Sequence, residues 1–115
     1  DVGDMVLQAF ARTAKAQLRE GDVLCRMGGE EFSILLPDTN PVKAEAIAER
    51  LRLSIEAATV TIGEDLIDGG NLTYTASFGV TEVKPDETSL KPAIKRADQA
   101  LYEAKETGRN CIVVA

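Results

Sequence analysis

Two adjacent glutamates, Glu30 and Glu31, directly follow two adjacent glycines, Gly28 and Gly29. Because glycine has no side chain, a bulky ligand can come close to the backbone at such a turn. Neighbouring carboxylates repel each other unless a cation lies near them, and a hard divalent metal with oxygen ligands relieves that repulsion. The run therefore predicts metal-assisted chemistry at a turn. The alternative interpretation is a plain Gly-Gly turn followed by two solvated acids.

Two cations near the C-terminus could bind the phosphates of a ligand. Lys105 and Arg109 lie four residues apart at the end of a predicted helix, so both side chains can point the same way. The alternative is that each cation only stabilises the helix C-terminus, by about 0.3–1 kcal/mol. Together with the acidic turn, the pair favours a nucleotide site. Because the sequence has no histidine, a hard-metal site must be built from carboxylates.

Composition limits the partners. The 115 residues are 44% hydrophobic and 28% charged, which is typical of one soluble globular domain. A formal net charge of −6 argues against a nucleic-acid backbone as the main partner, although not against a single nucleotide. No apolar run approaches the roughly 18–20 residues that span a membrane, and no segment resembles a signal peptide. Cys25 and Cys111 lie in β-branched apolar stretches and are expected to be small buried side chains.

The hydrophobic pattern predicts helices alternating with pairs of strands. Asp4 is a candidate N-cap for the first helix and Gly21 a candidate stop, and residues 23–27 and 32–36 are predicted to pair as a hairpin. The predicted elements are a helix capped by Asp4 with apolar positions from 7 to 18, strands over 23–27 and 32–36, a helix with apolar positions from 44 to 58, two strands within 59–81 around the turn 68–71 (the second over 72–80), a helix with apolar positions from 90 to 104 that stops at Gly108, and a strand over 111–114. This order predicts an α+β domain in which helices cover a mixed, mostly antiparallel sheet.

The hairpin and several other segments resemble one known family. Gly28-Gly29-Glu30-Glu31-Phe32, with Arg26 before it, is similar to the GG(D/E)EF signature of diguanylate cyclases. Further matches are Val2-Gly3-Asp4, the R-x-x-D-like Arg19-Glu20-Gly21-Asp22, the strand Ala76-Ser77-Phe78-Gly79-Val80, and residues 97–110 against A-D-x-A-L-Y-x-A-K-x-x-G-R-N. The chain therefore resembles the GGDEF family over essentially all of residues 1–115, as a single domain of nucleotide-cyclase or polymerase-palm-like fold.

The resemblance implies condensation of two GTP molecules to cyclic di-GMP with release of pyrophosphate. Each half-site would be supplied by one subunit of a homodimer, with Mg²⁺ or Mn²⁺ as cofactor. Glu30 and Glu31 would be metal ligands and catalytic residues, and Glu30 would also assist deprotonation of the 3′-hydroxyl. Gly28 and Gly29 would let the nucleotide lie against the hairpin.

Other positions receive roles by the same resemblance. Asp4 would bind the guanine edge, and Lys105 and Arg109 would hold the triphosphate. Arg19 and Asp22 would bind the product as an inhibitor, with Arg50 contributing from a neighbouring domain. The alternatives are a helix-terminating turn for the first pair and a solvated helix face for Arg50. Two further matching positions, Asp98 and Tyr102, are expected to be buried and to hydrogen-bond the neighbouring loop.

The family's first strand, which carries a metal-binding aspartate, would precede residue 1. We therefore expect this chain alone to be weakly active or inactive, either as a trimmed piece or with another copy supplying the strand. An upstream sensory domain is expected. A cytoplasmic location follows from the substrate, although the parent protein could be anchored to a membrane. The alternatives are a non-catalytic GGDEF-type receptor for GTP or cyclic di-GMP, and a palm-like cyclase with another substrate.

Overall fold

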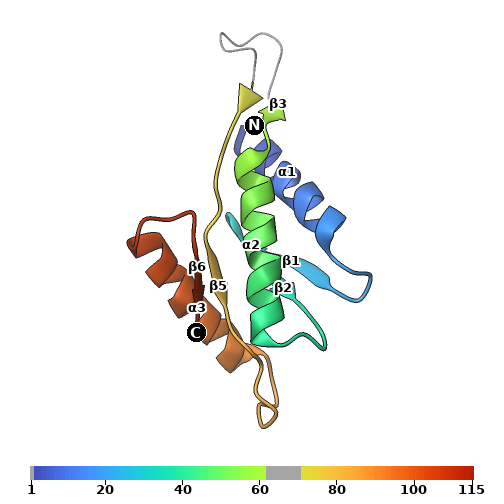
Figure 1. Cartoon of the computed structure of the whole chain (residues 1–115), viewed down its shortest axis with the longest axis vertical. Helices are drawn as coiled ribbons and strands as arrows, with labels where there is room; N and C mark the ends of the chain where they lie inside the picture. The colour runs from blue at the N-terminus through green and yellow to red at the C-terminus, as the bar shows by residue number, and fades with distance from the viewer. Residues whose placement is uncertain (1, 62–70) are drawn as a thin grey trace. The chain divides into compact units, whose positions relative to one another are not determined.

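The computed structural model describes residues 2–61 and 71–115 (Figure 1). The elements in this part of the chain are α1 (Val2–Gln17), β1 (Val23–Gly28), β2 (Glu31–Leu35), α2 (Pro41–Ala57), β3 (Val60–Thr61), β4 (Asn71–Leu72), β5 (Phe78–Val80), α3 (Lys91–Glu106) and β6 (Ile112–Val114). They fall into two compact units. The first unit contains the described residues up to Asp38 and those from Ser54 to Tyr74, and the second contains residues 39–53 and 75–115.

In the first unit, α1 packs against the hairpin of β1 and β2. The two strands are antiparallel, with Leu24 opposite Ile34, and the register shifts between Arg26 and Gly28. The rings of Phe10 on α1 and Phe32 on β2 lie 4.7 Å apart between centroids. Phe32 therefore lies against the helix. The predicted hairpin is confirmed.

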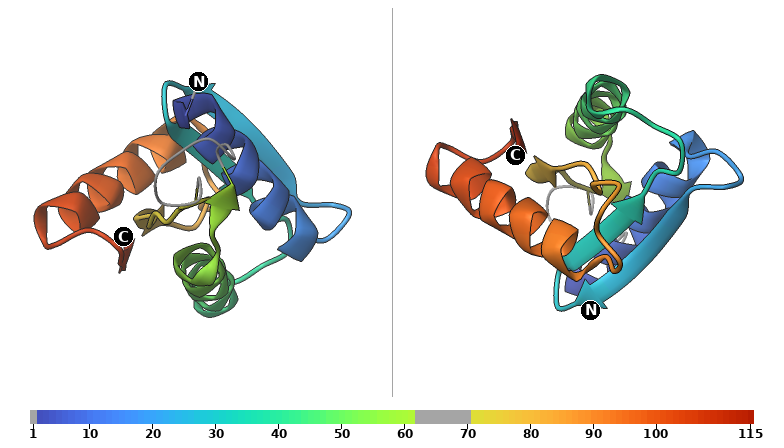
Figure 2. Two further views of the ribbon diagram at one scale, coloured as in Figure 1. Left: turned by 90° about the horizontal axis from the view of Figure 1, so that it is seen from above. Right: turned by 90° about the horizontal axis from the view of Figure 1, so that it is seen from below.

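In the second unit, α3 packs on a parallel pair of strands, β5 and β6 (Figure 2). Parallel strands need a long crossover, which α3 supplies here. The contact is close, because a Cβ placed on Gly79 would meet the backbone O of Ala97 at 2.1 Å and the N of Leu101 at 2.5 Å. On the helix, Ala93, Ala100 and Ala104 are buried. Small residues therefore let the strand approach the helix.

The helix α2 begins with an N-cap that the sequence encodes locally. The side chain of Asn40 accepts a hydrogen bond from the Lys43 N–H at 2.9 Å, and Pro41 occupies the first helical position. These are typical residues for a helix start. Ala48, Leu51 and Ile55 are buried at helical spacing, as predicted for this face. Leu51 and Ile55 are the largest fully buried side chains among the described residues.

The sheet differs from the prediction. Three two-stranded ladders are present among the described residues, β1–β2 and β3–β4 antiparallel and β5–β6 parallel, rather than one mixed sheet. The predicted strand over 72–80 is broken, because residues 73–77 lie in no strand. The predicted turn at 68–71 lies largely outside the described residues. A single sheet needs a strand that pairs on both sides, and each described strand has one partner.

Three local predictions are corrected. The helix α1 begins at Val2 and ends at Gln17, so Asp4 lies in the first turn rather than at the N-cap, and Gly21 belongs to the turn beyond the helix. A carboxylate in the first turn still complements the helix dipole. Cys25 is exposed, because it lies on the side of the hairpin where Val23 and Met27 are also exposed, and Cys111 is only partly buried. None of the described helices is long and apolar enough to cross a bilayer.

Candidate functional site

The hairpin turn presents two acidic side chains to solvent. The guanidinium of Arg26 donates to the Gly29 carbonyl from Nε at 3.0 Å and from Nη2 at 2.6 Å, which fixes the turn. Gly28 and Gly29 have φ of 144° and 54°, conformations that favour glycine. A Cβ at either glycine would meet no atom within 4 Å. Arg26 thus holds the turn through its backbone, while the space around the two glycines is open and Glu30 and Glu31 are exposed.

The donor set at this turn fits a magnesium-type ion in part. Mg²⁺ is commonly bound through one or two carboxylates, with substrate phosphates and water completing the octahedron. Glu30 and Glu31 can supply two carboxylates of that kind. Among residues 2–61 and 71–115, no group of three Asp, Glu or Cys side chains gathers as a metal site. The hairpin therefore suits an ion that arrives with a phosphate ligand better than one held by protein alone.

Asp4, the predicted guanine contact, is exposed in the first turn of α1, in the same unit as the hairpin. Its place on the helix leaves the carboxylate accessible to a ligand. A carboxylate accepts hydrogen bonds only, so it suits a ligand edge that presents adjacent N–H donors. The guanine edge, with its N1–H and N2–H₂ groups, is of this type.

Arg19 and Asp22 form a closed turn after α1. The Asp22 carboxylate accepts from the Arg19 backbone N–H at 2.8 Å and from Arg19 Nη2 at 3.2 Å. Nη2 also donates to the Pro37 carbonyl at 2.6 Å. The side chain of Asp22 is 2% exposed, whereas that of Arg19 is 60% exposed. Asp22 thus holds the turn, and Arg19 is the member of the pair that a ligand can reach.

The two predicted phosphate-binding cations are not on one helix. Lys105 is in the last turn of α3, which ends at Glu106, and Arg109 follows in an exposed turn. Gly108, Arg109 and Asn110 have φ of 124°, 63° and 47°. The left-handed conformation costs a residue with a side chain about 1–2 kcal/mol. The helical spacing that suggested a common direction therefore does not apply, although both cations belong to the second unit.

The remaining predicted residues are exposed on helix surfaces. Arg50 lies on the exposed side of α2 in the second unit, whereas Arg19 and Asp22 belong to the first. The expectation that Asp98 and Tyr102 are buried is wrong, since Asp98 is exposed and Tyr102 is 67% exposed. They lie one turn apart on the face of α3 opposite its buried alanines. Their family positions gave no signal of this exposure, although their helical phase did.

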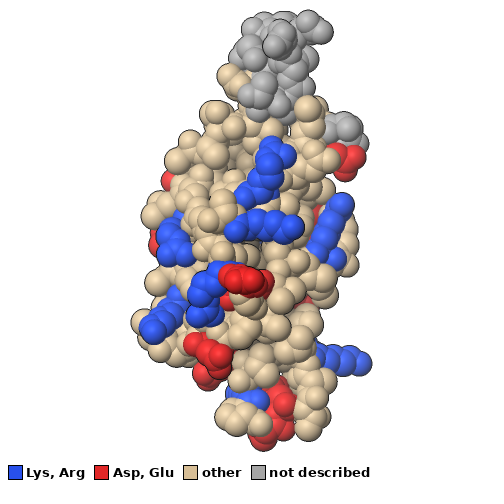
Figure 3. Space-filling view, turned by 90° about the vertical axis from the view of Figure 1, so that its right-hand side faces the viewer, with Lys and Arg blue, Asp and Glu red and all other residues tan. Residues whose placement is uncertain are grey.

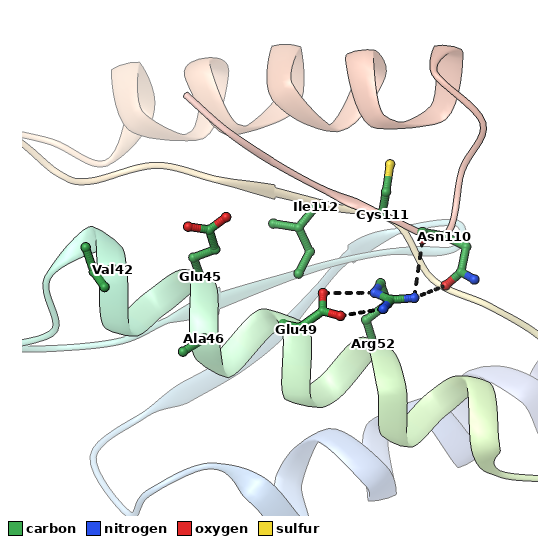
Figure 4. A pocket seen from close by; sticks show the side chains of 8 residues that line it. All are labelled: Val42, Glu45, Ala46, Glu49, Arg52, Asn110, Cys111 and Ile112. Carbon is green, nitrogen blue, oxygen red and sulfur yellow. Dashed lines mark hydrogen bonds and ion pairs between the residues drawn. The ribbon is translucent and has the colours of Figure 1, made fainter.

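Sequence reasoning missed a polar cluster beside a recess of about 570 Å³ in the second unit (Figure 4). Arg52 donates to the Glu49 carboxylate through Nε at 3.0 Å and through Nη2, and to Asn110 Oδ1 through Nη1 at 3.1 Å. The hydrogen bond from Arg52 lowers the pKa of Glu49, against the effect of burial. The spacing of Glu49 and Arg52 is a visible helical pair, but nothing local links Arg52 to Asn110, 58 residues away.

A second charged network in the same unit ties the segment before α3 to that helix. Arg96 donates to both carboxylate oxygens of Glu87 at 2.8 Å and to the Glu82 carbonyl at 2.7 Å. The Lys84 backbone N–H adds a bond to Glu87 at 2.7 Å. The hydrogen bonds from Arg96 and Lys84 lower the pKa of Glu87 to about 2. In return, the hydrogen bond with Glu87 raises the pKa of Arg96. This network has a structural role.

Local positive charge is exposed although the net charge is −6. On the face that Figure 3 draws, Lys and Arg side chains stand out beside Asp and Glu side chains. Arg19 and Arg109 are exposed in their respective turns. A compact anionic ligand needs only such local charge, so the composition does not oppose phosphate binding.

Comparisons with known proteins agree over almost the whole chain. The family model "Diguanylate cyclase, GGDEF domain" matches residues 1–111. Diguanylate cyclase A of Treponema denticola is 39% identical over 113 residues, covering 98% of this chain and 29% of that protein. The chain therefore spans less than a third of that relative's length.

Two solved structures are similar in fold. The GGDEF domain of DgcB from Caulobacter crescentus in complex with c-di-GMP has a TM-score of 0.88 at 27% identity, covering 98% of this chain and 64% of that chain. The diguanylate cyclase SiaD, in complex with its activator SiaC from Pseudomonas aeruginosa, has a TM-score of 0.85 at 39% identity, covering 97% of this chain and 41% of that chain.

Proposed function

The chain belongs to the GGDEF family of diguanylate cyclase domains, and from this premise we propose that residues 1–115 form a domain that condenses two GTP molecules into cyclic di-GMP and releases pyrophosphate. The observation that carries the proposal is the hairpin turn. Its glycines leave open space, Arg26 fixes its backbone, and its two glutamates are exposed beside that space. A receptor that only binds nucleotide has no need of both acids.

In this proposal the 3′-oxygen of one GTP attacks the α-phosphate of the other. A divalent metal, Mg²⁺ or Mn²⁺, neutralises charge on the phosphate oxygens when it is bound at Glu30 and Glu31. Glu30 also accepts the proton of the 3′-hydroxyl. Asp4 accepts hydrogen bonds from guanine N1–H and N2–H₂, and Lys105 and Arg109 hold the triphosphate by charge-assisted hydrogen bonds.

Two copies of the domain are part of this mechanism. Each GTP is both donor and acceptor of a nucleotidyl group, so one bound nucleotide reacts only when a second faces it. A two-fold homodimer brings identical half-sites together because its interface is isologous. We therefore propose that dimerisation controls the reaction.

We further propose that cyclic di-GMP inhibits the enzyme through Arg19, with Asp22 holding the turn and Arg50 of a neighbouring domain contributing. The 60% exposure of Arg19 and the similarity to the DgcB structure with bound c-di-GMP support this role. Arginine's planar fork suits both phosphate and the Hoogsteen edge of guanine. Because relatives are longer than this chain, an upstream sensory domain or a partner protein is the proposed source of control, and GTP as substrate favours the cytoplasm.

Calorimetric titration tests the substrate class. The probe is a GTP analogue with a methylene group between the α- and β-phosphates, added with and without Mg²⁺, and the matched ATP analogue is the control. We expect the guanine analogue to bind more tightly with Mg²⁺ than without it, and Asp4→Ala to reduce the difference in affinity between the guanine and adenine analogues. Equal affinity for both bases would contradict the proposed guanine contact, and equal affinity with and without Mg²⁺ would contradict the proposed role of the acids.

One observation favours a second function, a receptor for GTP or cyclic di-GMP without catalysis. Within the described ranges, the two hairpin acids are not joined by a third metal-ligating side chain. Both functions predict nucleotide binding, so affinity alone does not separate them. Formation of cyclic di-GMP from GTP separates them, because a receptor forms none.

A further inference from the structure

We propose that Arg52 is a positioning residue: it holds the turn at residues 108–110 and thereby sets the direction of Arg109. The inference rests on the proposed role of Arg109 in binding the triphosphate. Arg52 itself lies on α2, and its side chain is 16% exposed. It is therefore placed to act through the turn rather than on a ligand.

The turn has a backbone conformation that it does not hold by local contacts alone. Gly108, Arg109 and Asn110 all have positive φ, and only the first is a glycine. The Arg109 N–H donates to the Ala104 carbonyl at 3.0 Å, and the Asn110 N–H donates to Ser77 Oγ at 3.0 Å. Residues with side chains stay in left-handed conformations only where their surroundings hold them. At Asn110 those surroundings come from distant parts of the chain.

Arg52 also contacts this turn through its side chain. One edge of its guanidinium donates to the Glu49 carboxylate, and Nη1 donates to Asn110 at Oδ1 (3.1 Å) and at the backbone O (3.4 Å). Figure 4 shows the guanidinium between these two partners. Because the guanidinium is planar and rigid, fixing one edge on Glu49 fixes the direction of the donors that face Asn110. Glu49 thus anchors Arg52, and Arg52 holds Asn110.

Arg109 precedes Asn110 and is exposed. If Asn110 loses its side-chain and carbonyl contacts, the turn can relax toward negative φ, which side chains prefer. A change of φ at residues 109 and 110 swings the Cα–Cβ bond of Arg109. The guanidinium then no longer points where the fold directs it, and a phosphate contact that depends on direction is weakened.

The test measures affinity of the α,β-methylene GTP analogue with Mg²⁺ in four variants of the chain: Arg52→Gln, Arg109→Ala, the double variant, and Arg96→Gln. Arg96 is the matched control, because it also pairs with a glutamate in the second unit but binds the segment before α3. We expect Arg52→Gln and Arg109→Ala each to weaken binding about tenfold, the effect of losing one charge-assisted hydrogen bond. The double variant should bind no more weakly than Arg109→Ala, and Arg96→Gln should bind as the unchanged chain does.

Rescue and a backbone measurement separate this proposal from the proposed function. Arg52→Lys keeps the charge and one donor direction, so its affinity should lie between those of the unchanged chain and Arg52→Gln. Three-bond NMR couplings between the amide proton and Hα report φ at Arg109 and Asn110 in the absence of ligand. Positive φ retained in Arg52→Gln, or additive losses in the double variant, would overturn the positioning role. If the turn relaxes but Arg109→Ala leaves affinity unchanged, the phosphate role of Arg109 is overturned instead, while the hold of Arg52 on the turn stands.

Discussion

Single side chains in this domain divide between those that hold a turn and those that the turn presents to solvent. The guanidinium of Arg26 donates to the Gly29 carbonyl in the hairpin turn, and the neighbouring glutamates are exposed. Asp22 is almost fully buried while its partner Arg19 is exposed. Arg52 is mostly buried and contacts Asn110, next to the exposed Arg109. In each of these three turns, a residue that holds the turn lies beside an exposed residue that can bind a ligand.

The hairpin acids should make nucleotide binding depend on metal. Glu31→Gln keeps the shape of the side chain but removes a charge that would hold the ion. We expect the Mg²⁺-dependent gain in affinity for the GTP analogue to fall by about tenfold or more, the effect of losing one bond to a charged group. Calorimetric titration at several Mg²⁺ concentrations measures this gain. Glu20→Gln, in an exposed turn away from the hairpin tip, is the control. An unchanged Mg²⁺ dependence in Glu31→Gln would remove Glu31 from the metal site.

Arg19 and Asp22 should differ when each is replaced. Arg19→Ala removes an exposed guanidinium, so affinity for cyclic di-GMP should fall at least about tenfold with little loss of stability. Asp22→Ala removes the nearly buried acceptor of two hydrogen bonds and should also lower the free energy of unfolding by about 1–3 kcal/mol. Titration and urea unfolding measure the two effects. If Arg19→Ala binds cyclic di-GMP as the unchanged chain does, the turn is only a helix terminator.

At the scale of elements, the approach of β5 to α3 depends on one glycine. Gly79→Ala would place a methyl group 2.1 Å from the Ala97 carbonyl oxygen, and helix backbone cannot move aside as a flexible side chain can. Overpacking of this kind typically costs about 1–3 kcal/mol, and we expect a loss at the upper end in urea unfolding. Gly21→Ala is the control, since a Cβ there meets no atom within 4 Å. Equal stability of the two variants would show that the strand does not pack this closely.

The Glu87–Arg96 pair should make stability depend on pH at the acid end. The pKa of Glu87 is about 2 in the fold, against an ordinary value of 4.5. Between these values the unfolded chain binds more protons than the folded chain, so stability falls as pH falls. The contribution of Glu87 is complete above pH 4.5 and is lost as pH falls toward about 2. Glu49, whose pKa is also lowered, acts in the same direction.

Replacing the Glu87 carboxylate should therefore make the free energy of unfolding depend less on pH at the acid end. In Glu87→Gln, the free energy of unfolding should decrease less between neutral pH and about pH 3 than in the unchanged chain. Urea unfolding at each pH provides the measurement. Glu82→Gln is the control, because the backbone carbonyl of Glu82 accepts from Arg96. If the free energy of unfolding decreases as steeply in Glu87→Gln as in the unchanged chain, the Glu87–Arg96 pair does not determine how stability depends on pH in acid.

The elements that sequence predicts well are those with local causes. Helical spacing of apolar residues, Asn40 with Pro41, and a Gly-Gly turn between two apolar strands act within a few residues, and the three helices and the hairpin follow from them. The pairing of β5 with β6 and the contact of Arg52 with Asn110 join residues far apart in sequence. Their partners are selected by tertiary packing, so no local pattern specifies them.

The candidate site follows the same division. The glutamates and Arg109 were found from residue type and spacing, and the exposure of Glu30, Glu31 and Arg109 agrees with a ligand-binding role. The supporting role of Arg52 was not predicted, because an arginine on an amphipathic helix looks like part of a solvated face. The expectation for Tyr102 was wrong, since it was predicted to be a buried hydrogen-bonding side chain, whereas its helical phase places it opposite the buried alanines of α3.

At the scale of the whole molecule, the proposed function requires two copies of the domain. The match to Diguanylate cyclase A covers 98% of this chain but less than a third of that protein. A reaction in which each nucleotide is donor and acceptor requires two half-sites, so its rate should rise more steeply than linearly with protein concentration below the dimer dissociation constant. A linear rise would indicate that one copy completes the site.

Turnover of GTP by the purified protein separates catalysis from nucleotide binding alone. The purified protein is incubated with GTP labelled at the α-phosphate and Mg²⁺, products are separated by chromatography and identified by mass spectrometry, and ATP is run in parallel. Because this chain alone is expected to be weakly active, we expect slow formation of cyclic di-GMP, with two pyrophosphates released for each product molecule, none of the adenine product, and loss of product in both Glu30→Gln and Glu31→Gln. Retained binding of GTP without any cyclic di-GMP, or equal turnover in the glutamine variants, would contradict the proposed catalysis.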